Sequence, residues 1–452
     1  MMEGLHIGRT GLIAAQRGLE VAGHNVANVN TKGYSRQRVE QATGAPRPGS
    51  RGMAGPGATG SGVVVTGVTR LRDRLLDISF RDAVGDNTAW ETRSEFLQRA
   101  EEVLGPIEGG VPEALDRYWN AWEKLSMSPQ DVSSREEVLA AGRNLTQLMN
   151  SAANQMYTLQ VDAAGRASEL INEVNRVAAD VVDYNRAIQE ATARGDSPND
   201  MLDAREVAFD RLSELVGARV FLHEDGSSTV TVNGLPLVDG VRDFPLAEDP
   251  GPPLAVRWES DGRAAGVGGR LGAIVELSTS TLTSLSADLD QFAVELSALV
   301  NTAHGAGVDL DGNAGGAFFT GTNAGEFSLA AGLTARTVAA SAAGAATDGN
   351  HALVMGELRD SPLASGATPA QTLGAFASRL GLLTDEAIRN SDSSQSVVDG
   401  IDRQRMEASA VSIDEELTDM LRYQRAFEAS ARVITVIDEM LNKLINGTGS
   451  TR

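Results

Sequence analysis

The hydrophobic residues near the end of the chain repeat every three or four positions, as in a long helix that packs on another helix. A repeat of about 3.5 residues keeps one seam of the helix facing its partner along the whole length. Over 413–445 such a helix would be about 50 Å long. Two polar seam residues, Gln424 and Asp438, are candidates for setting the register of helix pairing. The seam positions are Ile413, Leu417, Met420, Gln424, Phe427, Ala431, Ile434, Asp438, Leu441 and Ile445.

A second heptad pattern lies at the beginning of the chain, with large residues on one row and small residues on the other. These rows are Leu5, Leu12, Leu19 and Val26, and Gly8, Ala15, Ala22 and Val29. Small side chains allow a second helix to approach closely. Because neither terminal seam has an evident partner in its own neighbourhood, we expect the two terminal helices to pack on each other. The alternative is that each of them packs on its own local domain.

The rest of the chain predicts helical rods with short β segments between them. The dipeptide Asn233-Gly234 is a strong signal for a two-residue hairpin. The predicted helices are 71–104, 112–127, 131–193 with breaks, 199–216, 270–304, and 369 to the C-terminus with a break at 390–396. The predicted strands are 63–68, 218–223, 229–232, 235–238 and 254–259.

These elements predict a mainly α fold with β insertions. In it the terminal helices form a coiled coil, long helices form a bundle domain, and one or more small β-rich domains lie outside. The expected segments are 1–43, the N-terminal part of the inner coiled-coil domain; 44–68, a Gly/Pro linker or extended loop; 69–217, the first part of the helical domain; 218–268, a β-rich outer domain; 269–304, the return of the helical domain; 305–365, a Gly/Ala-rich loop and β-rich outer segment; 366–411, the last part of the helical domain; and 412–452, the C-terminal part of the coiled-coil domain.

Composition excludes several kinds of partner and chemistry. The net charge of −22 argues against nucleic acid and against anionic membranes as partners. The chain has no cysteine, which excludes disulfides, thiolate catalysis and cysteine-based zinc sites. Arg9 and Arg17 interrupt the N-terminal apolar positions, so we expect no cleaved signal peptide. No apolar run is long enough to predict membrane insertion.

Motifs for catalysis or cofactor binding are weak. The glycines of 266–272 resemble a dinucleotide loop only faintly, and the five histidines are not spaced as paired metal ligands. Residues 309–313 resemble the start of a calcium loop, but Ala314 and Thr320 stand where that loop needs glycine and glutamate. We therefore expect a turn there, no catalytic, cofactor-binding or metal-binding residues, no cofactor, and a protein that is not an enzyme.

The sequence ANVNTKGYSRQ, which follows the first heptad, resembles the N-terminal signature of the bacterial flagellar rod, hook and hook-associated proteins. Its last residues favour the hook–filament junction members of that family. Four further stretches, 201–238, 268–277, 298–319 and 412–445, resemble the same proteins in the same order. The signature residues are Asn28, Thr31, Gly33, Tyr34, Ser35, Arg36 and Gln37.

The resemblance implies a structural, axial protein of the flagellum that joins the hook to the filament and permits filament assembly. It implies export through the flagellar type III apparatus without a cleaved signal peptide, and an extracellular location at the junction. The implied partners are further copies of the chain, the hook protein, the next junction protein, and an export chaperone that binds the C-terminal helix. The expected assembly seam consists of Leu5, Leu12, Leu19, Val26, Leu417, Met420, Phe427, Ala431, Ile434, Leu441 and Ile445.

Two other functions are compatible with the same patterns. The chain could be a different axial component, such as a hook, rod or flagellin-like protein. It could also be a secreted adhesin or hydrolase presented on a helical stalk, although no constellation of residues supports such an activity.

Overall fold

The computed structural model describes residues 2–45, 60–104, 109–249 and 254–447. They form two compact units, each assembled from stretches that are far apart in the sequence. Unit 1 contains residues 1–84, 175–245 and 396–452, and unit 2 contains residues 85–174 and 246–395. The predicted mainly α fold with β insertions is confirmed.

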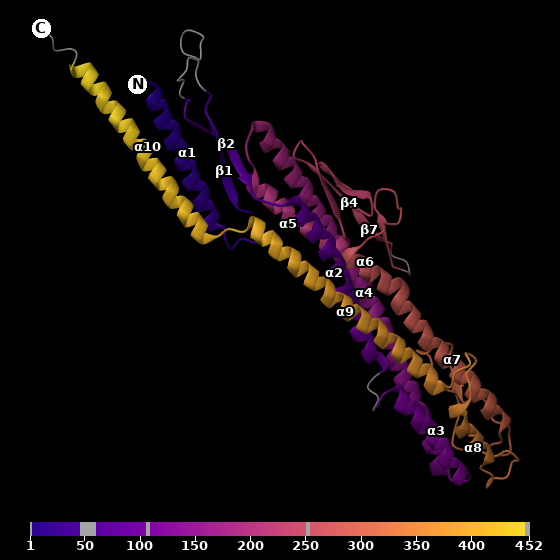
Figure 1. Ribbon diagram of the computed structural model, residues 1–452. Coiled ribbons are helices and arrows are strands. Elements are labelled where there is room, and N and C mark those ends of the chain that lie inside the picture. Colours follow the sequence, from indigo (N-terminus) through magenta and orange to yellow (C-terminus); the bar gives the residue numbers. More distant parts are fainter. Residues whose placement is uncertain (1, 46–59, 105–108, 250–253, 448–452) are drawn as a thin grey trace. The chain divides into compact units, whose positions relative to one another are not determined.

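In unit 1 the two ends of the chain lie side by side. Helix α1 (Met2–Ala27) and helix α10 (Ile413–Gly447) pack against each other, and Figure 1 shows them in indigo and yellow. The expected pairing of the terminal helices is therefore confirmed.

Four glycines of α1 allow the two helices to approach closely. A Cβ atom added at any of them would lie within 2.9 Å of a side chain of α10. The partners are Ile437 for Gly4, Ile434 for Gly8, Ser430 for Gly11 and Tyr423 for Gly18. Because the partners move backward along α10 as the glycines move forward along α1, the helices are antiparallel. This glycine row of α1 therefore fixes both the spacing and the register of the pair.

The glycine row also corrects the predicted seam of α10. One predicted row of the seam is half-buried, as expected: Met420, Phe427, Ile434 and Leu441. The other predicted row, Leu417, Gln424, Ala431 and Asp438, is displaced, and the residues that face α1 lie one position earlier. That alternate row is Glu416, Tyr423, Ser430 and Ile437. Successive residues of a helix lie only about 100° apart, so periodicity alone does not separate the two frames.

Several predicted seam residues do not face α1. Gln424 and Asp438 are exposed, so neither is a polar layer between α1 and α10. Leu417 and Ile445 are 48% and 70% exposed, and Ala431 is half-buried. On α1, the row Leu5, Leu12, Leu19 and Val26 is half-buried beside the glycine row. Burial of this row and of the exposed α10 residues by another subunit stays a prediction.

A two-stranded ribbon packs against α1. Strand β1 (Gln37–Thr43) pairs antiparallel with β2 (Val63–Arg70), with an irregularity between Glu40 and Gln41. A small apolar core joins Val21 of α1 to Val39 and Val68 of the ribbon. The strand predicted at 63–68 is confirmed, whereas β1 was not predicted. Residues 46–59 of the expected Gly/Pro linker lie outside the described residues.

The remainder of unit 1 combines helix ends with a four-stranded sheet. It includes the end of α4 (Val132–Arg194), all of α5 (Asn199–Val216), the start of α2 (Arg74–Glu101) and the end of α9 (Pro369–Ser409). The sheet has the order β3-β4-β5-β6. Its strands are β3 (Arg219–Leu222), β4 (Ser228–Val232), β5 (Leu235–Asp239) and β6 (Arg242–Asp243). Asn233 and Gly234 both have positive φ, at 48° and 80°, which confirms the predicted hairpin.

The amide of Asn185 fastens this sheet to α4. Its Nδ2 donates to the carbonyl oxygens of Ser228 and Gly240, at 3.1 and 2.6 Å, and its Oδ1 accepts from the Ser228 hydroxyl and from Arg205. Burial lowers the pKa of Arg205 to about 10, so this guanidinium still carries its charge at neutral pH.

Unit 2 is built on long helices. Besides parts of α2, α4 and α9 it contains α3 (Val111–Met127), α6 (Gly269–Glu276), a π-helical turn (Leu277–Thr281), α7 (Leu282–Ala306) and α8 (Asn350–Glu357). Short 3₁₀ turns occur at Glu102–Leu104 and Leu358–Asp360. Its strands pair as β7 (Leu246–Asp249) with β8 (Ala255–Trp258), and β9 (Phe319–Thr320) with β10 (Ser328–Leu329).

Four expectations about the elements are corrected. The helix predicted from 369 has no break at 390–396, because α9 continues to Ser409 and the interruption lies at 410–412. Helix α4 has none of the expected breaks, and α8 was not predicted. The expected β-rich segment 218–268 contains two sheets, of which β3–β6 belongs to unit 1 and β7–β8 to unit 2.

Most of the aromatic side chains with ring–ring contacts gather in one core in unit 2. Tyr118 and Trp122 of α3 contact Phe318, with ring centroids 5.6 Å apart in each pair. The full cluster is Tyr118, Trp119, Trp122, His304, Phe318, Phe319 and Phe327. Burial raises the pKa of the Tyr118 hydroxyl, which therefore stays neutral. This core orders the Gly-rich segment after α7.

We expect Gly18→Ala to destabilise the α1–α10 pair by about 1–3 kcal/mol, because the added methyl group overpacks a close contact. A Cβ at Gly18 would lie 2.5 Å from the Tyr423 ring, whereas Gly23 of the same helix has no neighbour within 4 Å. The matched control Gly23→Ala should stabilise the helix by about 0.5–1 kcal/mol. Urea unfolding followed by circular dichroism measures both; equal stabilisation by the two substitutions would disprove the close approach.

Candidate functional site

The signature segment that follows α1 forms a compact series of turns. The Asn28 amide donates to the carbonyl oxygen of His24 at 3.0 Å, and the Thr31 hydroxyl donates to the Asn28 side chain at 3.1 Å. Gly33 has a φ of 81°, a conformation that favours glycine. A side chain there would also collide with Val207 of α5. Asn28, Thr31 and Gly33 therefore redirect the chain from α1 into β1.

Asn25 is the centre of a buried polar cluster beneath these turns. Its Oδ1 accepts from the Tyr34 hydroxyl at 2.7 Å and from the Gln37 backbone N–H at 3.0 Å. Its Nδ2 donates to the Gln37 carbonyl oxygen at 2.9 Å and to Glu416 at 3.0 Å. Burial, together with nearby carboxylates, raises the pKa of Tyr34, so its hydroxyl remains a hydrogen-bond donor. One amide thus joins α1, β1 and α10.

Arg36 holds the first turn of α10 to the signature. Its Nε donates to the Glu416 carboxylate and its Nη1 to the Glu415 carboxylate, both at 2.6 Å. The Arg36 backbone N–H donates to the carbonyl oxygen of Ser409, the last residue of α9, at 3.0 Å. The Glu416 side chain is almost fully buried, and it is satisfied by Arg36 and Asn25. The turn between α9 and α10 is therefore fixed by one arginine.

Ser35 connects the signature to α5. Its backbone N–H and its hydroxyl both donate to the Asp203 carboxylate, at 3.0 and 2.7 Å. Arg70 at the end of β2 donates to the same carboxylate at 2.8 Å. Asp203 thus ties the signature and the ribbon to one turn of α5.

Gln37 makes a parallel connection one turn earlier on α5. Its Nε2 donates to Asp200 at 3.0 Å, and its Oε1 accepts from Asn199 at 3.1 Å. Asn199 also donates to the carbonyl oxygen of Val68 in β2, at 2.9 Å. The side chains of four consecutive signature residues, 34–37, therefore each bind a different partner.

A buried ion network continues the joint into α2 and α9. Asp77 of α2 accepts two hydrogen bonds from Arg72, at 2.7 and 3.0 Å, and one from Arg405 of α9, at 2.9 Å. Burial alone would raise the pKa of Asp77. Arg72, Arg405 and Arg81 outweigh it and hold that pKa below its usual range, so the carboxylate stays charged.

The network closes through α5. Arg405 and Arg81 donate to Asp210, at 2.9 and 2.8 Å, and Arg81 is also ion-paired with Glu206. The Arg405 guanidinium lies 4.1 Å from the ring centroid of Phe80. Paired buried charges are costly to separate, so α2, α5 and α9 are held in one arrangement. We call the side chains that make these contacts the polar joint. They are Asn25, Tyr34, Ser35, Arg36, Gln37, Arg70, Arg72, Asp77, Arg81, Asn199, Asp200, Asp203, Glu206, Asp210, Arg405, Glu415 and Glu416.

The seven predicted signature residues all lie at or beside the polar joint. Other residues of the joint, among them Asn25, Asp203, Arg405 and Glu416, were not predicted. Asn25 carries a signal, because it stands seven residues after Gly18 on the row that faces α10. The other three give no local signal, since charged residues are common on these helices. The assignment of the seven residues as a functional signature stays a prediction.

The geometry of the joint serves to hold elements together. A cleft of about 190 Å³ opens beside it, lined by Gly18, Arg36 and Tyr423 among others, but the polar groups of this cleft already bind one another. Within the described residues, no group of His, Asp or Glu is arranged to hold a metal ion. None of the helices described is long and apolar enough to cross a membrane.

The calcium-like segment is a turn, as expected. The Asp309 carboxylate accepts from the backbone N–H groups of Asp311 and Asn313, at 2.8 and 2.9 Å. Asp311 is ion-paired with Arg336. His304 is buried, and its Nε2 accepts from the Ala339 N–H at 2.9 Å; burial lowers its pKa, which fits a neutral ring. These residues order the loop after α7.

Comparison with known proteins agrees with this architecture. Residues 97–319 match the family model of the flagellar hook-associated protein FlgK helical domain. Residues 403–447 match the C-terminal model of the flagellar basal body rod FlgEFG proteins, and residues 5–34 match the flagella basal body rod protein model. The three matches cover both terminal helices and much of the chain between them.

Two relatives of the chain carry the same name. The chain is 27% identical to flagellar hook-associated protein 1 of Bacillus subtilis, over 99% of this chain and 98% of that protein. It is 27% identical to flagellar hook-associated protein 1 of Escherichia coli, over 69% of this chain and 58% of that protein. The flagellar hook junction protein FlgK of Burkholderia pseudomallei has the same fold. Its TM-score is 0.66 at 15% identity, over 74% of this chain and 100% of that chain.

The matches at both ends define a structural, axial protein of the bacterial flagellum. Together with the helical-domain match and the full-length relative, they show that the chain belongs to the flagellar hook-associated protein 1 family. The location is therefore the flagellum, and the chain assembles into its axial structure. As the sequence predicts, this family is structural and not enzymatic.

We expect Arg405→Met to destabilise unit 1 by about 3 kcal/mol, because it removes one partner each from the partly buried Asp77 and Asp210. Arg389 lies on the same helix and pairs with Asp385, but its side chain is 70% exposed. Arg389→Met should therefore cost less than about 1 kcal/mol. Urea unfolding of both variants measures the difference; equal costs would show that the network does not hold the joint.

The stability contributed by Asp77 should depend on pH in one direction. Its pKa is lowered in the folded chain, so its contribution is complete above the unfolded pKa of about 3.9 and is lost as the pH falls through the folded pKa. The difference in unfolding free energy between the wild type and Asp77→Asn should therefore be constant from neutral pH to about pH 5. It should shrink below pH 4. A difference that grows on acidification would contradict the ionised network.

Proposed function

We propose that the chain is a structural subunit of the junction that joins the flagellar hook to the filament and permits filament assembly. The observation that carries this proposal is the full-length similarity to flagellar hook-associated protein 1 of Bacillus subtilis. The helical-domain match separates the chain from rod proteins, because the terminal matches alone are to rod models. The alternative of an adhesin or hydrolase on a stalk is not retained, since the family is structural.

The paired terminal helices are the proposed inner, self-associating part of the subunit. The row Leu5, Leu12, Leu19 and Val26 stays half-buried along α1, and Leu417 and Ile445 of α10 are exposed. Apolar rows left open on a helix pair are typical of surfaces that another protein covers. Copies of the chain cover these rows in the assembled junction, and an export chaperone covers part of α10 before assembly.

The remaining partners and the route follow from the same proposal. The hook protein lies below the subunit and the next junction protein above it, outside the cell. The chain reaches this place through the flagellar type III apparatus, without a cleaved signal peptide. Within the subunit, residues 1–43 and 412–452 form the proposed inner coiled coil.

Deletion of the gene tests the proposal. We expect cells that keep their hooks but lose their filaments and release filament subunits into the medium. Loss of the hooks as well would show that the chain is a hook or rod component instead.

Leu19→Asp and Leu441→Asp test the proposed seam. Both should abolish filaments while the exported protein keeps the cooperative unfolding of its central helices, because a charge in a buried seam opposes subunit packing. Leu75→Asp is the matched control, because Leu75 is 75% exposed near the start of α2 and is not one of the proposed seam residues. Filaments retained in both seam variants would exclude the seam, as would loss of the whole unfolding transition, which would indicate one integrated core.

A further inference from the structure

One stretch of α4 carries no charge although it lies on the surface of unit 2. Residues 144–161 contain no Asp, Glu, Lys or Arg, in a chain of which 22% is charged and whose net charge is −22. Its apolar residues Leu145, Met149 and Met156 point inward and are fully buried. The stretch is thus an ordinary amphipathic helix in which uncharged polar side chains replace the usual charged face.

The outward side of this stretch is a shallow, amide-rich surface. It has a hollow of about 440 Å³, and we call its lining residues the amide face: Gln147, Asn150, Ser151, Asn154, Gln155 and Thr158. Two exposed residues flank it, Tyr157 at 65% and Val161 at 50% exposure. Amides and hydroxyls both donate and accept hydrogen bonds. Asn150 already donates to the carbonyl oxygens of Ala324 and Phe327, but the other residues of the face can bind an uncharged partner surface without separating ion pairs.

A second uncharged surface lies on α9 in the same unit. Residues 361–378 contain no charged residue. Leu373, Phe376 and Leu380 of α9 are buried. The opposite side presents an exposed row that we call the small face, and Leu382 at its end is 67% exposed. The small face consists of Gln371, Gly374, Ser378 and Leu382.

Contacts within unit 2 place the two faces on opposite sides. Helix α2 is ion-paired with α4 through Arg99 and Asp162 at 2.5 Å, and is hydrogen-bonded to α9 through Asn87 and Gln395 at 2.7 Å. Helix α7 is ion-paired with α9 by Arg379 at 2.6 Å, and it shares with α4 the loop at Ala324. Helices α2 and α7 therefore lie between α4 and α9, whose outward faces point away from each other.

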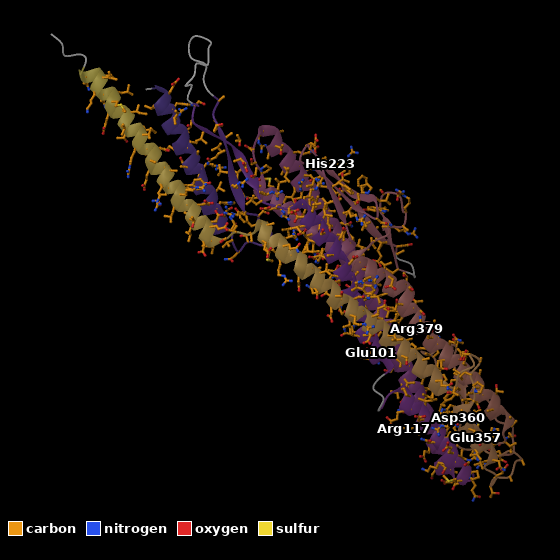
Figure 2. All side chains as sticks on the ribbon, viewed as in Figure 1. Glu101, Arg117, His223, Glu357, Asp360 and Arg379 are labelled. Carbon is orange, nitrogen blue, oxygen red and sulfur yellow. The ribbon has the colours of Figure 1, made fainter. Side chains whose placement is uncertain are left out.

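The same contacts place the faces at one level along the bundle. On α2, Arg99 pairs with Asp162, and Glu101 lies 3.8 Å from where a Cβ of Gly381 would be. Figure 2 labels Glu101 and, on α9 close by, Arg379. Helix α2 runs antiparallel to α4, because Arg99 pairs with Asp162 and the earlier Glu95 pairs with the later Arg166. It also runs antiparallel to α9, because Asn87 bonds to Gln395 and the later Glu101 lies at the earlier Gly381. The residues that precede Asp162 and Gly381 therefore run in the same direction from a common level.

We propose that the amide face of one copy binds the small face of the neighbouring copy in the assembled junction. The inference rests on the proposed function, which requires copies to pack around an axis. Two different faces on opposite sides of one subunit make a head-to-tail contact, the kind that generates rings and helices. Copies with a net charge of −22 repel one another, so contact surfaces free of charge keep that repulsion low, and interface centres are depleted in charged residues.

The chemistry of the two faces is complementary. Gly374 lets a partner surface approach α9 closely, and the exposed hydroxyl of Ser378 can bind the amides of that partner. Tyr157 and Leu382 stand at the exposed margins as apolar groups that gain from burial, and tyrosine is common among the residues that dominate binding energy. The partner is a second copy of this chain and no other protein.

Paired cysteines test the contact, since the natural chain has none. Flagella are isolated from cells that carry Gln155→Cys together with Ser378→Cys, treated with a short thiol-specific cross-linker and analysed by immunoblot. We expect a ladder of multimers from the double variant and monomers from each single variant. Dimers from Gln155→Cys alone would overturn the proposal, because they show that amide faces meet each other.

Charge variants provide a second test of the same contact. Asn154→Asp with Ser378→Asp places like charges across it and should abolish filaments, whereas Asn154→Asp with Ser378→Lys should retain them. Gln130→Glu, an exposed amide outside both faces, is the matched control and should retain them too. Filaments on the like-charge variant overturn the contact.

The two proposals fail in different ways. If flagella bear filaments and contain the double-cysteine protein but give no ladder of multimers, the contact is overturned and the proposed function stands. Absence of the protein from flagella overturns the proposed function and the contact with it.

Discussion

The close antiparallel approach of α1 and α10 is the constraint on which the rest of unit 1 depends. It is possible because a row of glycines on α1 leaves room for Ile437, Ile434, Ser430 and Tyr423 of α10. Such a pair has little freedom to slide, since a shift along the axis brings a bulky side chain of α10 onto a residue other than glycine. The spacing in turn sets where the first turn of α10 and the turns after α1 meet. All contacts of the polar joint presuppose that meeting point.

The polar joint adds orientation to this packing. Buried ion pairs contribute little net stability compared with apolar packing, but their hydrogen bonds have only one satisfactory geometry. Asp77, Asp203 and Glu416 each bind partners from more than one element, so moving any of these elements breaks bonds made to the others. For a subunit that repeats around an axis, a fixed direction of these helices matters more than a high melting temperature. The joint provides that direction with side chains on five helices and on both strands of the β1–β2 ribbon.

Long periodic segments were predicted well, and long-range polar pairing was not. Heptads predicted both terminal helices and their pairing, and Asn233-Gly234 predicted the hairpin, because these signals are local. The alternate row of the α10 seam was misplaced by one residue because both candidate rows mix apolar and polar residues only about 100° apart on the helix, and only the glycines of the partner helix choose between them. Strand β1 was missed because QRVEQAT has few apolar residues and gains its pairing from β2. Asp203 and Arg405 looked like any charged residues of an exposed helix, since their partners lie far away in sequence.

The polar joint also dictates an order of events. The bond between Asn25 and Glu416 closes a loop of 391 residues, and the loop-closure entropy for that length is roughly 5 kcal/mol. Local helices in unit 2 need no such closure, so they can form while α1 still has no partner. Pairing of the two ends therefore requires both ends of the sequence to be present. The residues that complete the polar joint come from opposite ends of the sequence, so α1 has no partner helix until α10 is present as well.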